Sequence, residues 1–326
     1  MHKRIRLGLV IALAGLFLWL MLRHIDLNEI GHAFAQADVW GISLAVAAFS
    51  AGLACKIERW RRMLLQANRA LTWTDCYGPM VASIAANNVL PFRAGDIVRA
   101  FGFNGRLGIS VSVSLTALVV ERLLDLLIVI SFLGLALITF GPESSRVIGV
   151  GGGVLLSGAV AILLILLFPG MFRPLLFWGA GLTSQLFPGL GAGIERELEK
   201  IFAALEYTAN CRTMSGLIVW SLLAWAAEGC AFWFTAVALP TIEVPTAAWL
   251  ALPVATLSGI VPSTPGFVGT FDYFTSQAMM MGGNTLAPAI AYALLVHLVL
   301  WFPPTLAGGM YLLLNPPSTA TVKESS

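Results

Sequence analysis

A short polar stretch in the first third of the chain carries side chains suited to binding a charged ligand. It runs from Asn87 to Arg99 and reads Asn-Asn-Val-Leu-Pro-Phe-Arg-Ala-Gly-Asp-Ile-Val-Arg, in a chain that is 58% apolar and only 11% charged. A centrally placed Arg or Asp costs roughly 2.5 to 3.5 kcal/mol inside a bilayer, so such residues persist mainly where they pair or line a pathway. The stretch is therefore a candidate binding site.

Phosphate is the ligand that this stretch is best suited to hold. Arg93 and Arg99 carry guanidinium groups, which stay charged and bind phosphate oxygens bidentately. Pro91 disfavours a helical conformation at the residue before it, so Asn87 and Asn88 are expected to lie at the end of a half-helix. Asp96 is expected to orient the two arginines when no ligand is bound. The competing interpretation is an ordinary basic loop at the membrane surface, which does not explain the paired asparagines.

Acidic side chains occur in two later apolar segments. Glu121 and Asp125 are one helical turn apart and share a face, with Arg122 beside them. Glu121 lies about 18 Å into its helix if that helix begins near Ile109. A self-neutralised structural cluster and a direct role in proton or headgroup binding fit this pattern equally well. Glu228 is an isolated acid in another apolar segment, and its partner is expected on a different helix.

A second polar interruption spans residues 262–272 and reads Pro-Ser-Thr-Pro-Gly-Phe-Val-Gly-Thr-Phe-Asp. Ser263 and Thr264 offer hydroxyl groups, and Gly266 allows close approach of the backbone. Asp272 adds a carboxylate just inside the following half-helix, where an acid is also a common partner of the helix dipole. Two such interruptions in one apolar chain indicate a paired site.

Several ligand classes are not expected. The four cysteines are scattered without a Cys-x-x-Cys pair, so neither a disulfide framework nor a zinc site is expected. His297 has no nearby His or Cys and is interpreted as a structural histidine rather than a metal ligand. The glycine run at 149–153 does not follow a strand, which excludes a nucleotide-binding loop. No metal, cofactor or nucleic acid is therefore expected.

Apolar runs of membrane-spanning length, about 20 residues each, recur from end to end of the chain. They predict spans at 7–22, 39–57, 109–140, 147–168, 213–238 and 286–314. The segments 76–90 and 246–281 are apolar but broken by Pro, Gly and polar residues, and we predict re-entrant hairpins there, because irregular backbone at membrane depth must be buried or face a wet cavity. The predicted class is an all-α integral membrane protein, a polytopic helical bundle.

The order span, span, interrupted hairpin, span occurs twice, at 7–140 and 147–314. An odd number of membrane crossings in each half gives the second copy the opposite orientation in the membrane. This predicts inverted repeats, a recurring transporter architecture. We expect one transmembrane domain over residues 1–326, with a cytoplasmic linker at 171–212.

Basic residues predict the orientation in the membrane. They cluster before the first span, which is expected to remain as an uncleaved anchor, and in the loop that joins the second span to the next segment, to which we assign Lys56, Arg59 and Arg61. By the positive-inside rule both termini should be cytoplasmic, in a bacterial inner membrane. Arg59 and Glu228 are secondary site candidates. Several tryptophans are expected in interfacial belts: Trp40, Trp60, Trp73, Trp249 and Trp301.

Three motifs together resemble the lysylphosphatidylglycerol synthase transmembrane, or flippase-like, family. They are the 87–99 stretch, Glu121-Arg122-x-x-Asp125, and the 262–272 interruption. In the family the last motif usually reads Pro-x-x-Pro-Gly-Gly-x-Gly-x-x-Glu, whereas this chain has Phe267 and Asp272 at the second glycine and the acid. The resemblance implies movement of polar lipids between leaflets. Two-part members continue into a soluble aminoacyl transferase, and a stand-alone member is expected here.

The leading hypothesis is therefore a lipid translocase, not an enzyme, that moves an anionic phospholipid, a hopanoid or an isoprenoid-linked lipid. The residues expected to capture the headgroup are Asn87, Asn88, Arg93 and Arg99, and those expected to line its path are Glu121, Asp125 and Asp272. Rival hypotheses are a secondary transporter of a small solute, a membrane-embedded lipid-modifying transferase, and a scaffold. The expected partners are membrane lipids; self-association and a lipid-biosynthetic enzyme partner are left open.

Overall fold

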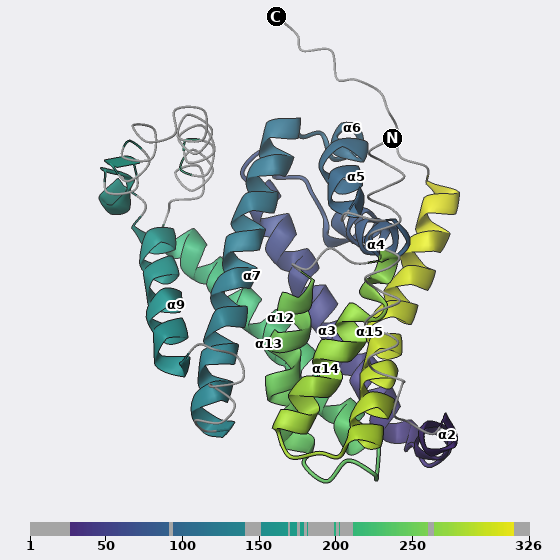
Figure 1. Ribbon diagram of the computed structural model, residues 1–326. Coiled ribbons are helices and arrows are strands. Elements are labelled where there is room, and N and C mark those ends of the chain that lie inside the picture. The colour runs from purple at the N-terminus through teal and green to yellow at the C-terminus, as the bar shows by residue number, and fades with distance from the viewer. Residues whose placement is uncertain are drawn as a thin grey trace, which may run out of the picture.

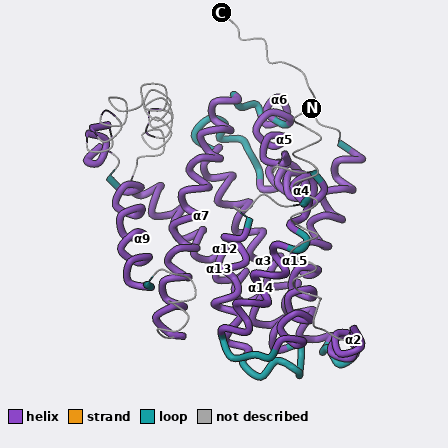
Figure 2. Tube along the Cα trace, in the orientation of Figure 1, coloured by secondary structure: helices purple, strands orange, loops and turns teal. Residues whose placement is uncertain are grey.

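The computed structural model describes residues 27–90, 94–140, 151–168, 170–174, 177–178, 181, 199, 202, 211–259 and 264–315. Every regular element within these residues is a helix, which confirms the predicted all-α class (Figures 1 and 2). The predicted site residues Arg93 and Ser263 lie outside the described residues. So do the span predicted at 7–22 and most of the linker at 171–212.

Among the residues that the structure describes, four helices are long and apolar enough to cross a membrane. They are α3 (Val39–Leu64), α7 (Val111–Phe140), α12 (Cys211–Val237) and α15 (Leu286–Leu314). The longest, α7, has 30 residues and extends about 45 Å at 1.5 Å per residue, more than the roughly 30 Å hydrocarbon core. A shorter apolar helix, α9 (Gly152–Leu167), packs along α7. The chain is thus a multi-pass membrane protein.

One predicted boundary is wrong, and the error concerns the candidate site. The span predicted to end at residue 57 continues as α3 to Leu64. Lys56 and Arg59, assigned from the sequence to a cytoplasmic loop, are therefore helical, and Arg59 is 1% exposed. Their charges end the apolar run, but the helix continues because both side chains find acidic partners on other helices.

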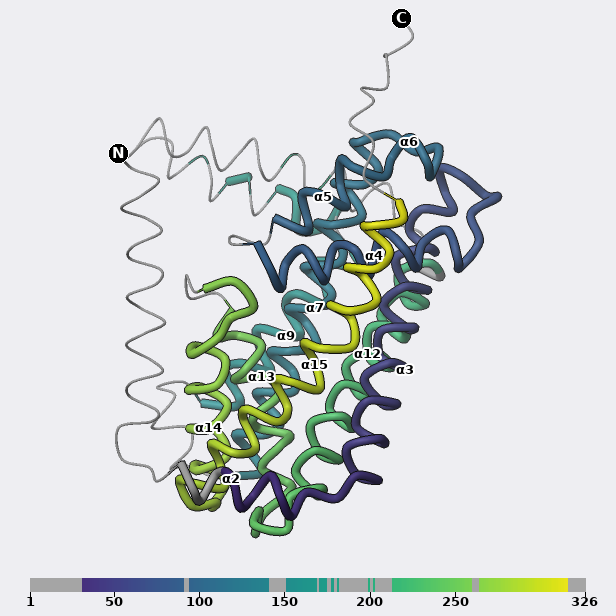
Figure 3. Tube along the Cα trace, turned by 90° about the vertical axis from the view of Figure 1, so that its right-hand side faces the viewer, coloured from purple at the N-terminus to yellow at the C-terminus, as the bar shows by residue number. Residues whose placement is uncertain are grey.

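Helices α3 and α12 lie side by side and run antiparallel (Figure 3). Small residues allow their backbones to approach closely, as is common between membrane helices. A Cβ atom on Gly41 would lie 2.7 Å from Cβ of Ala238, and one on Gly52 would lie 2.9 Å from the carbonyl oxygen of Ala224. This contact fixes the register that brings Arg59 beside α12.

Both interrupted segments form helical hairpins, and the hairpins enter the bundle from opposite ends (Figures 1 and 3). The first consists of α4 (Trp73–Val89) and α5 (Ala94–Gly102), followed by the short α6 (Asn104–Leu107). The second consists of the 3-10 turn η1 (Pro245–Ala247), α13 (Ala248–Ser258), the 3-10 turn η2 (Pro265–Phe267) and α14 (Thr270–Met281). The remaining element, α2 (Leu27–Ala35), packs against α15.

The end of α4 and the turn η2, which we call the tips of the first and second hairpins, meet inside the bundle. Gly266, in η2, has a φ of 69°, and a Cβ atom there would lie 3.0 Å from the carbonyl oxygen of Asn88 and 2.9 Å from Nε1 of Trp301. Along the rest of α4, α15 approaches so closely that a Cβ on Gly308 would lie 2.0 Å from the carbonyl oxygen of Val81. The structure therefore brings the two predicted interruptions together.

Candidate functional site

A polar cavity of about 230 Å³ lies beside the hairpin tips. It is lined by Lys56 of α3, by Met80, Ser83, Ile84, Asn87 and Asn88 of α4, by Asp96 and Arg99 of α5, by Glu121, Arg122 and Asp125 of α7, and by Phe267 of η2. We call this space the central cavity. Most of the residues predicted for the site line it, and these come from the first hairpin, α4 and α5, and from the spanning helix α7.

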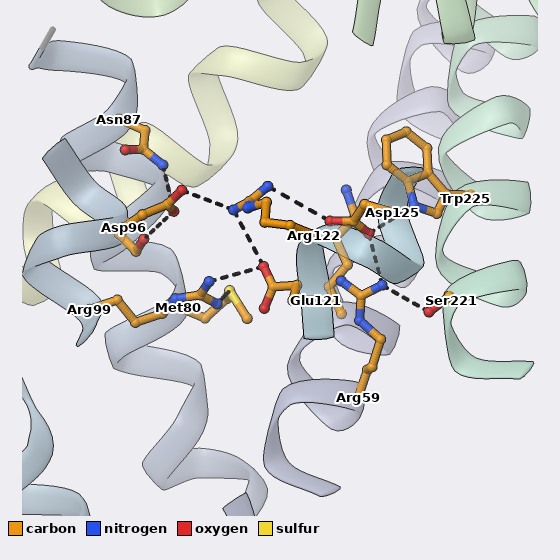
Figure 4. Close-up of polar contacts among 12 residues, drawn as sticks. Arg59, Met80, Asn87, Asp96, Arg99, Glu121, Arg122, Asp125, Ser221 and Trp225 are labelled. Carbon is orange, nitrogen blue, oxygen red and sulfur yellow. Dashed lines mark hydrogen bonds and ion pairs between the residues drawn. The ribbon is translucent and has the colours of Figure 1, made fainter. Parts of the chain in front are cut away.

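Arg99 is held in a buried pocket of its own. One guanidinium nitrogen is 2.9 Å from Oε1 of Glu121, and another is 3.0 Å from the sulfur of Met80 (Figure 4). The guanidinium also stacks over the ring of Trp60, with 5.1 Å between its carbon and the ring centroid. The side chain of Arg99 is only 4% exposed. Its charge is thus neutralised inside the protein.

Arg59 is buried just as deeply on the other side of Glu121. Its Nη1 atom lies 2.8 Å from Oδ1 of Asp125 and 2.9 Å from the hydroxyl of Ser221. The same Asp125 oxygen accepts a 3.0 Å hydrogen bond from the indole of Trp225 (Figure 4). These contacts join α3, α7 and α12 at one point, as expected for a charge that must be paired when it is desolvated.

Arg122 differs from the other two arginines because its side chain is 42% exposed. It lies between three carboxylates: it is 3.0 Å from Asp96, 3.5 Å from Glu121 and 3.7 Å from Asp125 (Figure 4). The two longer contacts exceed the usual length of a charge-assisted hydrogen bond. Arg122 is therefore the cavity arginine best placed to exchange a protein carboxylate for a ligand anion.

The asparagines at the end of α4 hold different partners. Nδ2 of Asn87 donates to Asp96 at 3.1 Å, and Asp96 also pairs with Arg122; Arg93, one of the two arginines that Asp96 was predicted to orient, lies outside the described residues. Nδ2 of Asn88 donates to the hydroxyl of Thr305 at 2.7 Å. The first asparagine thus belongs to the central cavity, and the second ties the tip of the first hairpin to α15.

Glu228 has the partner on another helix that the sequence predicted. It forms an ion pair with Lys56 of α3, whose ammonium group also lies 4.7 Å from the ring centroid of Trp225. The pair completes a set of charges that we call the charge cluster. Its basic members are Lys56, Arg59, Arg99 and Arg122, and its acidic members are Asp96, Glu121, Asp125 and Glu228. The formal charges of these described residues cancel.

Two buried oxygen atoms of this site have no hydrogen-bond partner among the described residues. They are Oε2 of Glu121 and Oδ1 of Asn87. Both residues line the central cavity. A buried acceptor without a donor costs roughly 1 to 3 kcal/mol, so a donor brought to either atom would be favourable.

Thr264 and Asp272, polar residues of the second interruption that the structure describes, lie apart from the charge cluster. Asp272 is 1% exposed; its Oδ2 atom accepts from the backbone N–H of Gly269 at 2.9 Å, and its Oδ1 atom lies 2.7 Å from Nδ1 of His297. The hydroxyl of Thr264 donates to the carbonyl of Val268 at 2.9 Å. Asp272 and Thr264 therefore stabilise the hairpin tip, and neither lines the central cavity.

Sequence reasoning missed several partners in the site. Trp60 was assigned to an interfacial belt, but it is 1% exposed and lies under Arg99. Ser221 and Trp225 were not predicted at all, although both bind the Arg59–Asp125 pair. An isolated serine or tryptophan in an apolar helix is common, so the sequence held no signal that set these two apart.

Comparison with known proteins gives one family. The family model described as the lysylphosphatidylglycerol synthase TM region matches residues 5–308. A glycosyltransferase of Haloferax volcanii, AglD, is 27% identical in an alignment 358 positions long that covers 99% of this chain. A UPF0104 membrane protein of Pyrococcus horikoshii is 23% identical over 86% of this chain. The chain spans 57% of the length of the first relative and 88% of the second.

Proposed function

Because the chain belongs to the family of the lysylphosphatidylglycerol synthase TM region, we propose that it moves lipids with polar headgroups between the two leaflets of a cytoplasmic membrane. The observation that carries this proposal is the central cavity, a polar space at the meeting point of two hairpin tips within an apolar bundle. Transporters with broken helices bind their substrates in such places. Its volume of about 230 Å³ fits a headgroup, so the acyl chains would stay in the surrounding lipid.

The charge balance of the cavity favours a particular kind of headgroup. The charge cluster is already neutral, so a purely anionic ligand would add an uncompensated charge to a desolvated place, which is costly. A zwitterionic headgroup avoids this cost, because its own ammonium group balances its phosphate. The phosphate would bind Arg122, and the ammonium group would donate to the oxygens of Glu121 and Asn87 that have no donor among the described residues.

The proposed path through the membrane rests on an inverted repeat. Three helix contacts support it. Helices α3 and α12, the equivalent spans of the two halves, pack against each other; α4 of the first hairpin packs on α15, and α13 of the second hairpin packs on α7. If each helix is replaced by its equivalent in the other half, the contact of α4 with α15 becomes that of α13 with α7, and the contact of α3 with α12 is unchanged. This is the relationship expected of repeats around a two-fold axis in the membrane plane.

The charges at the two ends of the bundle support an orientation with both termini in the cytoplasm. Arg61, Arg62 and Arg106 lie near the end where α3 stops and α7 begins, whereas Asp38 and Glu243 lie near the opposite end. By the positive-inside rule the first of these ends faces the cytoplasm. The first hairpin would then open to the cytoplasm and the second to the outside.

Lipid translocation is tested with purified protein in vesicles that contain a fluorescent phospholipid in both leaflets. Quenching of the outer leaflet by a membrane-impermeant reductant reports how fast inner-leaflet lipid becomes accessible. We expect transport by the wild type, loss of at least about tenfold for Arg122→Gln, equivalent to 1.4 kcal/mol, and no loss for the control Arg106→Gln. Arg106 is exposed and its guanidinium contacts Asn315 away from the cavity. Quenching at the rate of empty vesicles for a panel of anionic, zwitterionic and glycosylated lipids would overturn the proposal.

A lipid-modifying transferase is the second candidate, because one of the relatives is described as a glycosyltransferase. Glu121 lines the central cavity and has one carboxylate oxygen without a donor among the described residues, so it could accept a proton from an attacking hydroxyl. Incubation of the purified protein with a lipid-linked sugar donor and an acceptor lipid distinguishes the two functions. Product formed by the wild type and lost in Glu121→Gln would favour the transferase.

A further inference from the structure

A second polar site lies at the tip of the second hairpin, outside the central cavity. His297 of α15 places both of its ring nitrogens against oxygen atoms of this hairpin. Nδ1 is 2.7 Å from Oδ1 of Asp272, and Nε2 is 2.8 Å from the carbonyl oxygen of Gly266. The ring also lies against Phe271, with 4.7 Å between ring centroids.

These two contacts require a fixed number of protons. A carbonyl oxygen and a carboxylate both accept hydrogen bonds, and a neutral imidazole has only one N–H to donate. A neutral His297 beside an ionised Asp272 would therefore leave a nitrogen lone pair facing an oxygen at hydrogen-bond distance, an arrangement that is repulsive. Both contacts are hydrogen bonds only when Asp272 and His297 together hold one proton more than a neutral imidazole and an ionised carboxylate do.

We infer that Asp272, His297 and the Gly266 carbonyl form a proton-binding site that holds the tip of the second hairpin against α15. The bound proton has two possible positions. Either the imidazole is doubly protonated and Asp272 is ionised, or the imidazole is neutral and Asp272 donates its own proton to Nδ1. In both forms the pair is electrically neutral, which suits a carboxylate that is 1% exposed.

The charged groups on the neighbouring helices do not replace this proton. Asp272 is the charged side chain of α14 that contacts His297. On α3 and α12, Lys56 and Glu228 pair with each other, and on α4, Asp75 bonds with Thr72 at the far end of that helix. His32 of α2 lies beside the start of α15, next to Ala33. None of these described groups forms a hydrogen bond or ion pair with the Asp272–His297 pair.

Loss of the proton would release the tip at the edge of the central cavity. Gly266 lies against Asn88 and Trp301, and the next residue, Phe267, lines the central cavity. Phe267 also has a φ of 61°, an uncommon conformation for a bulky residue that its surroundings must stabilise. Breaking the Nε2 contact removes one of those restraints, so protonation and the shape of the cavity are linked.

The proton count is tested by NMR of the protein in lipid nanodiscs with ¹⁵N-labelled histidine and ¹³C-labelled aspartate carboxyls. Difference spectra against His297→Gln and Asp272→Asn assign the two groups. We expect either two protonated nitrogens on His297 or a protonated carboxyl on Asp272 at neutral pH. A singly protonated ring together with an ionised carboxyl would overturn the proposal, whether or not the protein transports lipids.

Asp272→Asn is also the informative variant for function. Its amide Nδ2 would donate to Nδ1 of a neutral His297, and its oxygen would still accept from Gly269, so both contacts of the imidazole persist without the extra proton. Coupling to transport rests on the proposed lipid translocation. We expect the rate of a transport step that uses the site to depend on pH in the wild type, and this dependence to differ in Asp272→Asn. The same pH dependence in wild type and variant would refute the coupling, whereas no transport in either refutes the proposed function and leaves the NMR result standing.

Discussion

Arg59 and Asp125, 66 residues apart in the sequence, form an ion pair of 2.8 Å in the middle of the bundle. The arginine side chain is 1% exposed and the aspartate side chain is 16% exposed. Ser221 and Trp225 of α12 bind the same pair. Three spanning helices therefore depend on one charge contact, and the neighbouring members of the charge cluster depend on the position of α7 that it fixes.

Removal of one partner of this pair is expected to destabilise the protein strongly. Arg59→Met leaves Asp125 buried without its basic partner, which typically costs about 3 to 5 kcal/mol. The double variant Arg59→Met/Asp125→Leu should recover most of this loss, because it buries no unpaired charge. Thermal unfolding in detergent measures both. Arg62→Met is the control, since its exposed pair with Glu58 should contribute less than about 1 kcal/mol; equal losses for Arg59→Met and the control would contradict the prediction.

Adjacent glycines of α15 provide a matched test of its packing on α4. A Cβ on Gly308 would lie 2.0 Å from the carbonyl oxygen of Val81, whereas a Cβ on Gly309 would meet nothing within 4 Å. Gly308→Ala should therefore separate the two helices and cost at least about 1 to 3 kcal/mol. Gly309→Ala should be neutral or slightly stabilising, because alanine favours helix by about 1 kcal/mol over glycine. Melting temperatures that do not differ between the two variants would show that α4 and α15 are not in this register.

Substitution of two arginines of the central cavity should distinguish an effect on the stability of the fold from an effect on transport. Arg99→Gln leaves the buried Oε1 atom of Glu121 without its nearest cation and is expected to destabilise the fold by about 3 kcal/mol. Arg122→Gln should cost less, because 42% of that side chain is exposed, and should reduce transport in protein that remains folded. Size-exclusion profiles and melting temperatures, measured beside the vesicle assay, distinguish the two outcomes. An Arg122→Gln variant that is folded and fully active would remove Arg122 from the site.

The start of α4 should become less stable in acid. Asp75 accepts hydrogen bonds from the hydroxyl and the backbone N–H of Thr72, and these lower the pKa of its carboxyl below the ordinary value. A lowered pKa in the folded state means that this contribution is present above the unfolded-state pKa and is lost as the pH falls through the folded-state pKa. Thr72→Ala should cost about 1 kcal/mol at neutral pH and progressively less below about pH 4. Hydrogen exchange of the first turn of α4 measures the difference, and a constant difference across this pH range would refute the role of Asp75.

Much of the helix plan and the location of the cavity could be predicted from the sequence. The length of an apolar run sets the length of a spanning helix, and proline and glycine interrupt a helix locally, so the breaks after Val89 and before Thr270 were visible in the residues themselves. Burial of polar groups is costly in any membrane fold, which marked Asn87, Glu121 and Asp125 as site residues. Where charges met an apolar run, as at Lys56, this local reasoning ended the helix too early.

Only the tertiary structure decided which of these groups are partners. Arg99 binds Glu121 while Asp96 binds Arg122, and His297, expected to be merely structural, bridges Asp272 and Gly266. The sequence determined that each charge needs a partner, because an unpaired charge in a bilayer is costly. It did not determine the partner, because pairing depends on the register between antiparallel helices. Close contacts between small residues far apart in the chain set that register.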